Sequence, residues 1–256
     1  MNLADVHRFF DPYRSLLGDE WDAFCETCTR PLPATFWVNP TKVPIERVIQ
    51  SFREDGYDPH PYVWMPSGFE IKLPPTSRTG KLGLGRRFEN KVGWIHLQES
   101  ASFLPPLILD PQPGELVLDL CAAPGGKSAQ IASMMNNQGT LIVNDINFDR
   151  LRAVRATQER LGLYNLVLCS EDGQTFLADE PPCFDRVLVD VPCSCEGTIR
   201  KHKKWRFHRD LRFKKNVLFP TQKRLLMNAL RLTKIGGVVV YSTCTLDPDE
   251  NEKIIH

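Results

Sequence analysis

Several features of membrane and secreted proteins are missing from this chain of 256 residues. No apolar run approaches the roughly 18 residues that a membrane-spanning helix needs. Residues 1–14 lack the apolar core of a secretory signal. Internal repeats and low-complexity tracts are absent as well. We therefore expect an intracellular protein, of the cytoplasm or the nucleus, with no membrane partner.

Signs of the secreted context in which disulfides form are also missing, although the chain contains eight cysteines. Disulfides are typical of secreted proteins, so we expect free thiols here. Cys25 and Cys28 form a CxxC pair, but no second pair lies at zinc-ribbon spacing. We therefore expect no metal site. Cys121, Cys193 and Cys244 directly follow apolar, strand-like runs, where active-site loops begin.

An overall excess of charge is absent too, because the net charge is +1. The basic residues are concentrated locally: residues 200–215 read RKHKKWRFHRDLRFKK, with nine Lys or Arg against one Asp. The interleaved Trp and Phe favour a surface that holds phosphates and stacks bases, although a solvated loop is the simpler alternative. The predicted RNA-binding residues are Arg200, Lys201, Lys203, Lys204, Trp205 and Arg206.

The pattern of the chain changes near residue 90. Residues 1–30 have apolar residues at helical spacing, and residues 31–90 are rich in proline and aromatic side chains. In residues 31–90 we predict strands at 35–38, 62–64 and 69–71, a helix at 45–55 and a loop at 74–87. Small strand–helix–strand modules of this kind often bind RNA.

After a predicted helix over residues 97–109, strands and helices alternate. The predicted strands are residues 116–120, 140–145, 166–169, 186–191 and 238–243. Helices are predicted to begin near residues 128, 148 and 221. Strands with continuous β-branched and leucine runs, alternating with helices, predict a parallel sheet that is covered on both faces.

The first strand of this sheet leads into a loop of small residues, in the sequence LVLDLCAAPGGKS at 116–128. The loop has neither a GxGxxG motif nor the glycine spacing of a Walker A loop. Small side chains let the backbone approach a ligand, and the following helix offers free N–H groups to an anion. A nucleoside with one carboxylate, such as S-adenosylmethionine, suits this loop. Asp145 and Asp172 follow the next two strands and could bind ribose and adenine, although helix caps or solvated acids are the alternative.

Two cysteines follow the fourth and fifth strands, in the sequences DVPCSC at 190–195 and YSTCT at 241–245. Parallel strands end at one edge of a sheet, so we expect Cys193 and Cys244 to face the same crevice. A thiolate that adds to carbon 6 of cytosine makes carbon 5 reactive enough to accept a methyl group. Asp190 is placed to stabilise charge on the ring. Buried structural cysteines are the alternative.

The motifs together resemble those of the Sun-domain (Nop/Sun, Fmu-like) RNA cytosine-5 methyltransferases, from about residue 33 onward. The matching elements are PATFWVN at 33–39, QESAS at 98–102, CAAPGGKS at 121–128, ND at 144–145, DVPCS at 190–194, GTIRK at 197–201, YSTCT at 241–245 and ENE at 250–252. The resemblance implies an α/β fold with two domains. A Rossmann-like, S-adenosylmethionine-dependent methyltransferase sheet would span residues 91–256. A small RRM-like α+β RNA-binding module would span residues 1–90.

The resemblance also implies a role for each site residue. Cys244 would be the nucleophile and Cys193 would assist release of the product, with Asp190 and Lys127 completing the catalytic set. The target cytosine would have to leave any base stack to reach them. The implied cofactor-binding residues are Cys121, Ala122, Ala123, Pro124, Gly125, Gly126, Lys127, Asp145, Arg150, Asp172 and Asp190.

We therefore expect a monomeric, S-adenosylmethionine-dependent RNA (cytosine-5-)-methyltransferase. Residues 190–205 favour tRNA as the substrate, with rRNA second. The alternatives are a DNA cytosine-5 methyltransferase, a non-catalytic RNA-binding paralogue and a small-molecule or protein methyltransferase. Two features depart from the family pattern. Cys195 stands where the family usually has a small residue, and the chain ends at His256, soon after ENE, as a fragment or shortened paralogue would.

Overall fold

The computed structural model describes residues 2–72, 80–201 and 213–256. The chain divides into two compact units. Unit 1 comprises Met1–Pro33, Cys193–Phe219 and Thr243–His256, and unit 2 comprises Ala34–Pro192 and Pro220–Ser242. The boundary between functional domains that we predict near residue 90 stays a prediction.

A five-stranded parallel sheet forms the larger part of unit 2, in the order β7-β6-β5-β8-β9. Its strands are β5 (Leu116–Asp119), β6 (Thr140–Asn144), β7 (Leu166–Cys169), β8 (Phe184–Asp190) and β9 (Thr233–Ser242). All neighbouring pairs are parallel, and the chain winds outward from β5 first on one side and then on the other. This Rossmann-like arrangement confirms the predicted fold class, and β9 begins earlier than predicted.

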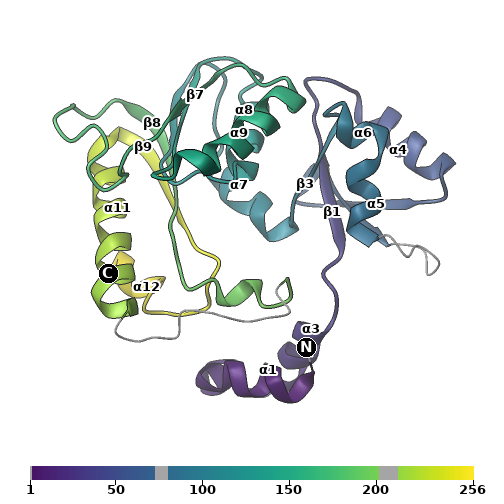
Figure 1. Cartoon of the computed structure of the whole chain (residues 1–256), viewed down its shortest axis with the longest axis horizontal. Helices are drawn as coiled ribbons and strands as arrows, with labels where there is room; N and C mark the ends of the chain where they lie inside the picture. The colour runs from purple at the N-terminus through teal and green to yellow at the C-terminus, as the bar shows by residue number, and fades with distance from the viewer. Residues whose placement is uncertain (1, 73–79, 202–212) are drawn as a thin grey trace. The chain divides into compact units, whose positions relative to one another are not determined.

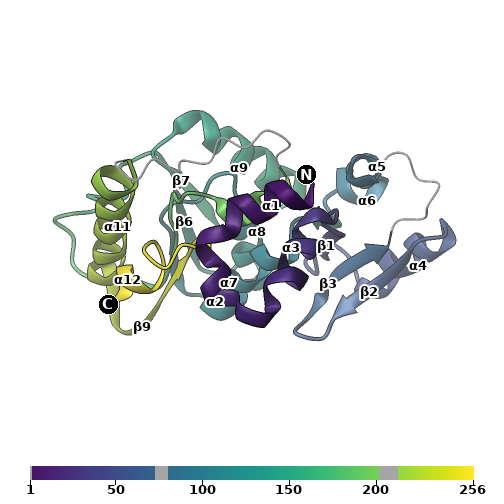
Figure 2. The same cartoon turned by 90° about the horizontal axis from the view of Figure 1, so that it is seen from below.

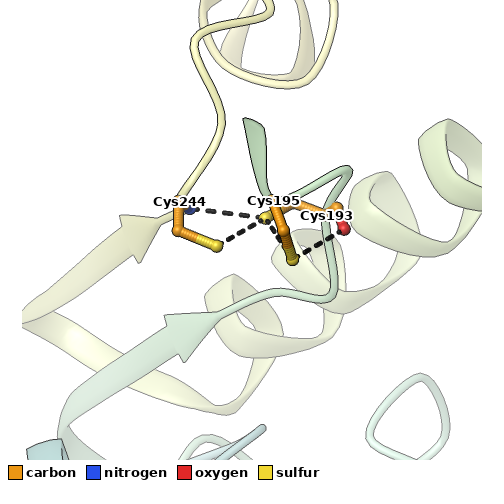
Figure 3. A group of neighbouring side chains, drawn as sticks. All are labelled: Cys193, Cys195 and Cys244. Carbon is orange, nitrogen blue, oxygen red and sulfur yellow. Dashed lines mark hydrogen bonds between the residues drawn. The ribbon is translucent and has the colours of Figure 1, made fainter. Parts of the chain in front are cut away.

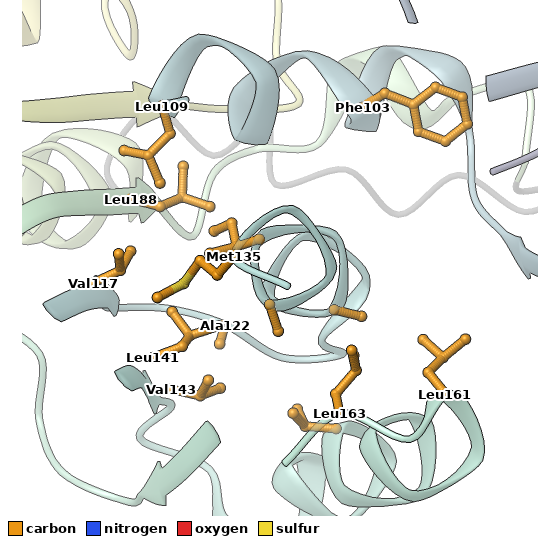
Figure 4. Packing of buried hydrophobic residues seen from close by; sticks show 14 of the residues in the cluster. Phe103, Leu109, Val117, Ala122, Met135, Leu141, Val143, Leu161, Leu163 and Leu188 are labelled. Carbon is orange, nitrogen blue, oxygen red and sulfur yellow. The ribbon is translucent and has the colours of Figure 1, made fainter. Parts of the chain in front are cut away.

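Helices cover both faces of this sheet, because its strands send successive side chains to opposite sides. Val117 and Leu188 belong to the core beneath α7 (Leu104–Leu109), α8 (Gly126–Met134) and α9 (Phe148–Leu161), part of which Figure 4 shows. Leu118 and Val187 belong to a second core, beneath α11 (Phe219–Leu232). In Figure 1, α11 lies on one side of the sheet and the other three helices lie on the opposite side.

A second, antiparallel sheet in unit 2 has the order β2-β3-β1-β4. Its strands are β1 (Ala34–Val38), β2 (Asp58–Tyr62), β3 (Met65–Lys72) and β4 (Ile95–Leu97). Helix α4 (Ile45–Glu54) buries Phe52 against Phe36 of β1, with ring centroids 5.0 Å apart. Figure 2 shows α4 beside β2 and β3. The predicted α+β architecture is therefore present, and RNA binding by it stays a prediction.

Three predicted elements are wrong in detail. Residues 63–64 form the turn between β2 and β3 rather than a strand, because Tyr62 pairs with Met65. The predicted loop at 74–87 contains helix α5 (Gly80–Arg86), and residues 73–79 lie outside the described part. The predicted helix at 97–109 is β4 followed by the 3₁₀-helix η3 (Ser100–Phe103) and α7, because two prolines at the start of α7 prevent a continuous helix.

Unit 1 gathers short helices from three separate segments of the chain. Its elements are α1 (Leu3–Phe10), η1 (Asp11–Tyr13), α2 (Arg14–Leu17), η2 (Gly18–Glu20), α3 (Trp21–Thr29), η4 (Glu196–Thr198), the π-helix η5 (Lys214–Leu218) and α12 (Glu252–Ile255). Phe9, Phe10 and Trp21 form its core together with Ile199. The helices predicted in residues 1–30 are thereby confirmed. Within the described residues, no helix has the length and apolarity that spanning a membrane requires.

Candidate functional site

The loop after β5 connects the central strand of the sheet to the start of α8. Gly125 has φ of +97°, and a Cβ there would lie 3.0 Å from the Val154 side chain. The position therefore favours glycine on both backbone and packing grounds. The first N–H groups of α8 lack intrahelical partners and lie next to this small-residue loop, as an anion site requires.

Asp145 and Arg150 support the same loop from the β6 side. The buried Asp145 carboxylate accepts the main-chain N–H of Ala123 at 3.0 Å and lies 3.4 Å from the Arg150 guanidinium. Arg150 also donates a hydrogen bond to the carbonyl of Ala123. Both predicted residues therefore lie at the loop, where they hold its backbone. Asp172 lies after β7, where its carboxylate accepts the main-chain N–H of Gln174 at 2.9 Å.

Asp190 and Lys127 form an ion pair at the end of β8. Lys127 Nζ lies 2.7 Å from one carboxylate oxygen of Asp190, and Ser242 donates to the other at 2.8 Å. Asp190 pairs with Ser242 in the register of β8 and β9. The sequence predicted the two charged residues but not Ser242, which comes close only because the two strands are paired.

Asp119 is a second residue that the sequence reasoning missed. Its carboxyl is fully buried at the end of β5 and accepts the Ser128 hydroxyl at 2.6 Å. Burial raises the pKa of Asp119 to about 7, and the neighbouring charge of Asp190 adds to this effect. The signal available in the sequence was an aspartate at the end of an apolar strand.

Three thiols meet in unit 1, on the segments that follow β8 and β9 (Figure 3). Cys193 Sγ lies 3.3 Å from Cys244 Sγ and 3.9 Å from Cys195 Sγ. The main-chain N–H of Cys244 also points to Cys193 Sγ, at 3.3 Å. Cys244 is exposed and Cys193 is almost buried. The two predicted cysteines are therefore close together, and Cys195, the departure from the family pattern in the DVPCSC sequence, lies beside them.

The close approach of these thiols affects their ionisation. The contact with Cys195 raises the pKa of Cys193, and burial raises it further. The contact with Cys193 is the main reason that the pKa of Cys244 is raised well above its ordinary value. Placing two thiolates side by side is unfavourable, so the cluster favours one negative charge at most. Burial also raises the pKa of Cys121 strongly, which keeps that thiol neutral.

A buried ion cluster lies beneath the cysteine segments in unit 1. Lys214 Nζ lies 2.7 Å from Asp247, 3.2 Å from Glu250 and 3.3 Å from Glu196. Glu250 in turn accepts the main-chain N–H of Ser194 at 2.9 Å, next to Cys193. The sequence reasoning placed Lys214 in a basic, RNA-facing run, and the structure shows it buried with acids instead.

The rest of the predicted RNA-binding run is described only in part. The Arg200 guanidinium donates to the carbonyls of Arg30 and Pro31, at 2.9 and 3.0 Å, within unit 1. Lys201 is exposed. The other four predicted RNA-binding residues lie outside the described part of the chain: Lys203, Lys204, Trp205 and Arg206.

The donor set at the end of the parallel sheet fits a nucleoside that carries a carboxylate. A small-residue loop and a helix N-terminus follow β5, acidic side chains follow β6 and β7, and Asp190 is the last residue of β8. In parallel sheets, cofactors commonly bind in a crevice at the carboxyl ends of the strands, next to the point where the strand order reverses. The predicted cofactor residues of unit 2 therefore share one edge of the sheet.

Comparison with known proteins identifies the family. The family described as 16S rRNA methyltransferase RsmB/F matches residues 106–256. Ribosomal RNA small subunit methyltransferase F of Vibrio vulnificus is 38% identical over 241 residues, covering 92% of this chain and 49% of that protein. Its counterpart from Aliivibrio fischeri is 36% identical, covering 99% of this chain and 52% of that protein. The chain thus spans about half the length of the curated relatives it matches.

Solved structures agree with this assignment. The crystal structure of a methyltransferase homologue from Pyrococcus horikoshii is 34% identical with a TM-score of 0.83, and the match covers 99% of this chain and 80% of that one. The structure titled NSun6 from Pyrococcus horikoshii with SFG has a TM-score of 0.79 at 20% identity, covering 96% of this chain and 84% of that one, and shows the fold alone. The resemblance found in the sequence motifs is thereby confirmed, and the chain belongs to the RsmB/F family of Sun-domain methyltransferases.

Proposed function

We propose that this chain transfers a methyl group to carbon 5 of a cytosine in RNA. The observation that carries the proposal is the pair of cysteines, with 3.3 Å between Cys193 Sγ and Cys244 Sγ. Methyl transfer to oxygen or nitrogen needs no thiol, whereas transfer to cytosine carbon 5 needs a nucleophile and, later, a base. Family membership supports the same reaction.

In this mechanism Cys244 attacks carbon 6 of the cytosine, because its thiol is the exposed member of the pair. Asp190, held by Lys127 and Ser242, stabilises the charge that develops on the ring. After methyl transfer, removal of the carbon 5 proton lets the bond between Cys244 and carbon 6 break. We assign this assistance to Cys193, which lies within hydrogen-bond distance of Cys244.

S-adenosylmethionine would supply the methyl group. The loop residues Cys121 to Lys127 and the N-terminus of α8 would hold its carboxylate, Asp145 its ribose and Asp172 its adenine. Arg150 would act through the loop, because its guanidinium bonds to Ala123 and Asp145.

Small-subunit ribosomal RNA is the substrate that we now favour, because the curated relatives are named for it. The sequence motifs favoured tRNA, which becomes the second candidate. In either RNA the target base must be unstacked to meet Cys244. The monomeric state and the intracellular location stay predictions.

The two cysteine roles can be separated by trapping the covalent intermediate. We expect Cys193→Ala to accumulate a protein–RNA adduct that survives denaturing electrophoresis, because Cys244 can still attack but release is slowed. Cys244→Ala should form no adduct and transfer no methyl group. Cys183→Ala, which removes a thiol just before the start of β8, at the opposite end of that strand from Cys193, should behave like the parent protein.

A Cys244→Ala variant that keeps its activity would overturn the proposed mechanism. Incubation of the parent protein with 16S rRNA, tRNA and matched DNA, each with radiolabelled S-adenosylmethionine, identifies the substrate class. Methylation of DNA alone would contradict the RNA assignment. Failure to bind S-adenosylmethionine in calorimetry would favour a non-catalytic RNA-binding role.

A further inference from the structure

Cys195 is a third thiol beside Cys193 and Cys244, and neither of the proposed catalytic roles requires it. We propose that Cys193, Cys195 and Cys244 form a binding site for a thiophilic divalent cation of the zinc class. The three Sγ atoms lie within 4.8 Å of one another. In the described part of the chain, no other three His, Cys, Asp or Glu side chains bring their ligand atoms together in this way. The sequence alone predicted no metal site.

The separations of the sulfur atoms match those of a metal–thiolate site. Tetrahedral zinc has Zn–S bonds of about 2.3 Å, which places neighbouring sulfur ligands about 3.8 Å apart. Cys193 Sγ lies 3.3 Å from Cys244 Sγ and 3.9 Å from Cys195 Sγ. All three sulfurs lie within 4.8 Å of one another, so movements of about 1 Å or less, within the range of side-chain rotation, would bring them to one ion.

The backbone conformation of Cys195 brings the third sulfur into place. Its φ of +59° lies in the left-handed region, which is uncommon for a residue with a side chain. In this conformation the Cys195 thiol turns back and donates to the carbonyl of Cys193 at 3.3 Å. The sulfurs of two residues that are only two positions apart therefore lie on the same side of the segment, as Figure 3 shows.

Ligand chemistry selects the class of cation. Three thiol sulfurs favour zinc, cadmium or copper(I) over magnesium or calcium, which prefer oxygen. Cys244 is exposed, so an ion can enter from solvent, and a water molecule would complete the fourth position. On binding, three S–H bonds break, three metal–sulfur bonds form and three protons pass to the buffer. No electron is transferred, so the step needs no oxidant.

The consequence for activity rests on the proposed function. A bound cation would engage Cys193 and Cys244 together, leaving neither free to attack or to release cytosine. Methylation would then stop reversibly, and a chelator would restore it. A protein with only the catalytic pair would offer two ligands and would bind the ion more weakly.

Cadmium is the probe for a direct test, because sulfur-to-cadmium charge transfer absorbs in the ultraviolet. We expect one equivalent of Cd²⁺ to develop this band in the reduced full chain, and Zn²⁺ to displace it. Cys195→Gly removes one sulfur and suits the positive φ of that position. It should weaken Cd²⁺ binding by more than about tenfold, since loss of even an outer partner of a metal ligand typically costs that much. Cys183→Ser, a matched loss of one thiol outside the cluster, should bind like the parent.

Equal Cd²⁺ affinity in the parent and in Cys195→Gly would overturn the inference, as would a band that appears only with several equivalents. The methylation assay is read separately. A chain that binds Cd²⁺ through Cys195 but methylates no RNA refutes the proposed function and leaves the metal site standing. A chain that methylates RNA but does not bind Cd²⁺ refutes the metal site and leaves the proposed function standing. If both proposals hold, the Zn²⁺ concentration that halves methylation should be more than about tenfold lower for the parent than for Cys195→Gly, because the variant has one sulfur ligand fewer.

Discussion

At the scale of single residues, Asp119 shows how burial changes the chemistry of a common side chain. Its carboxyl ends β5 with no exposed surface, and one oxygen has a single hydroxyl partner in Ser128. Among the described residues, the other oxygen has no hydrogen-bond partner. Because burial disfavours the charged form, the pKa of Asp119 rises to about 7 in the folded protein.

Asp119 should therefore make stability fall as the pH rises. The folded pKa of about 7 lies above the ordinary value of 3.8, so the unfolded chain loses this proton first. The free-energy cost of ionising Asp119 in the folded protein is absent below about pH 4 and fully present above about pH 7. We expect the free energy of unfolding of the parent, relative to Asp119→Asn, to fall by on the order of 4 kcal/mol at most across this range. Urea unfolding at several pH values measures the difference. A difference that stays constant with pH would contradict the prediction.

At the scale of elements, the π-helix η5 carries a buried cation that joins the other segments of unit 1. Lys214 is 5% exposed and contacts acids of η4 and of the segment after β9. Burial by itself would lower the pKa of Lys214, but Asp247 and the two glutamates raise it above its ordinary value. Lys214 is therefore charged at neutral pH and compensates several buried carboxylates.

Removal of this cation should destabilise unit 1 strongly. Lys214→Met leaves Glu196 and Glu250 buried without their counterion, which typically costs about 3–5 kcal/mol. The matched control is Lys215→Met, because Lys215 is the next residue and is exposed. That variant should stay within about 0.5 kcal/mol of the parent. Denaturant unfolding gives both values, and equal effects in the two variants would show that the buried cluster is not important for stability.

At the scale of the whole molecule, the cysteine segments share a compact unit with the N-terminal helices. The core of unit 1 contains Phe9, Phe10 and Trp21 from residues 1–33 and Ile199 from the segment after Cys193. Tyr13 also donates a hydrogen bond to Glu196. Residues far apart in the chain therefore hold the region around the thiols together.

Phe10→Ala should loosen the cysteine segments without unfolding the parallel sheet. Phe10 is 1% exposed, and truncation of such a ring typically costs about 3–5 kcal/mol. We expect faster hydrogen exchange in residues 193–201 and 243–256, with little change in β5 and β6. Leu16→Ala, at a side chain that is 70% exposed, is the control and should leave exchange unchanged. Equal acceleration in β5 and in residues 193–201 would argue against separate units.

The sequence alone determined the parallel strands, the small-residue loop, the acids at successive strand ends and the two cysteines. These features are local: each is a short apolar run followed by a loop, and parallel strands necessarily end at one edge of their sheet. Only tertiary structure decided how Lys214, Asp119 and Cys195 behave. Lys214 stands in a basic run, but Glu250 compensates its charge. Asp119 is an acid whose pKa is raised by burial. Cys195 becomes a third sulfur beside Cys244 through its backbone conformation. Burial and pairing of this kind come from contacts between distant segments, which no local pattern of residues encodes.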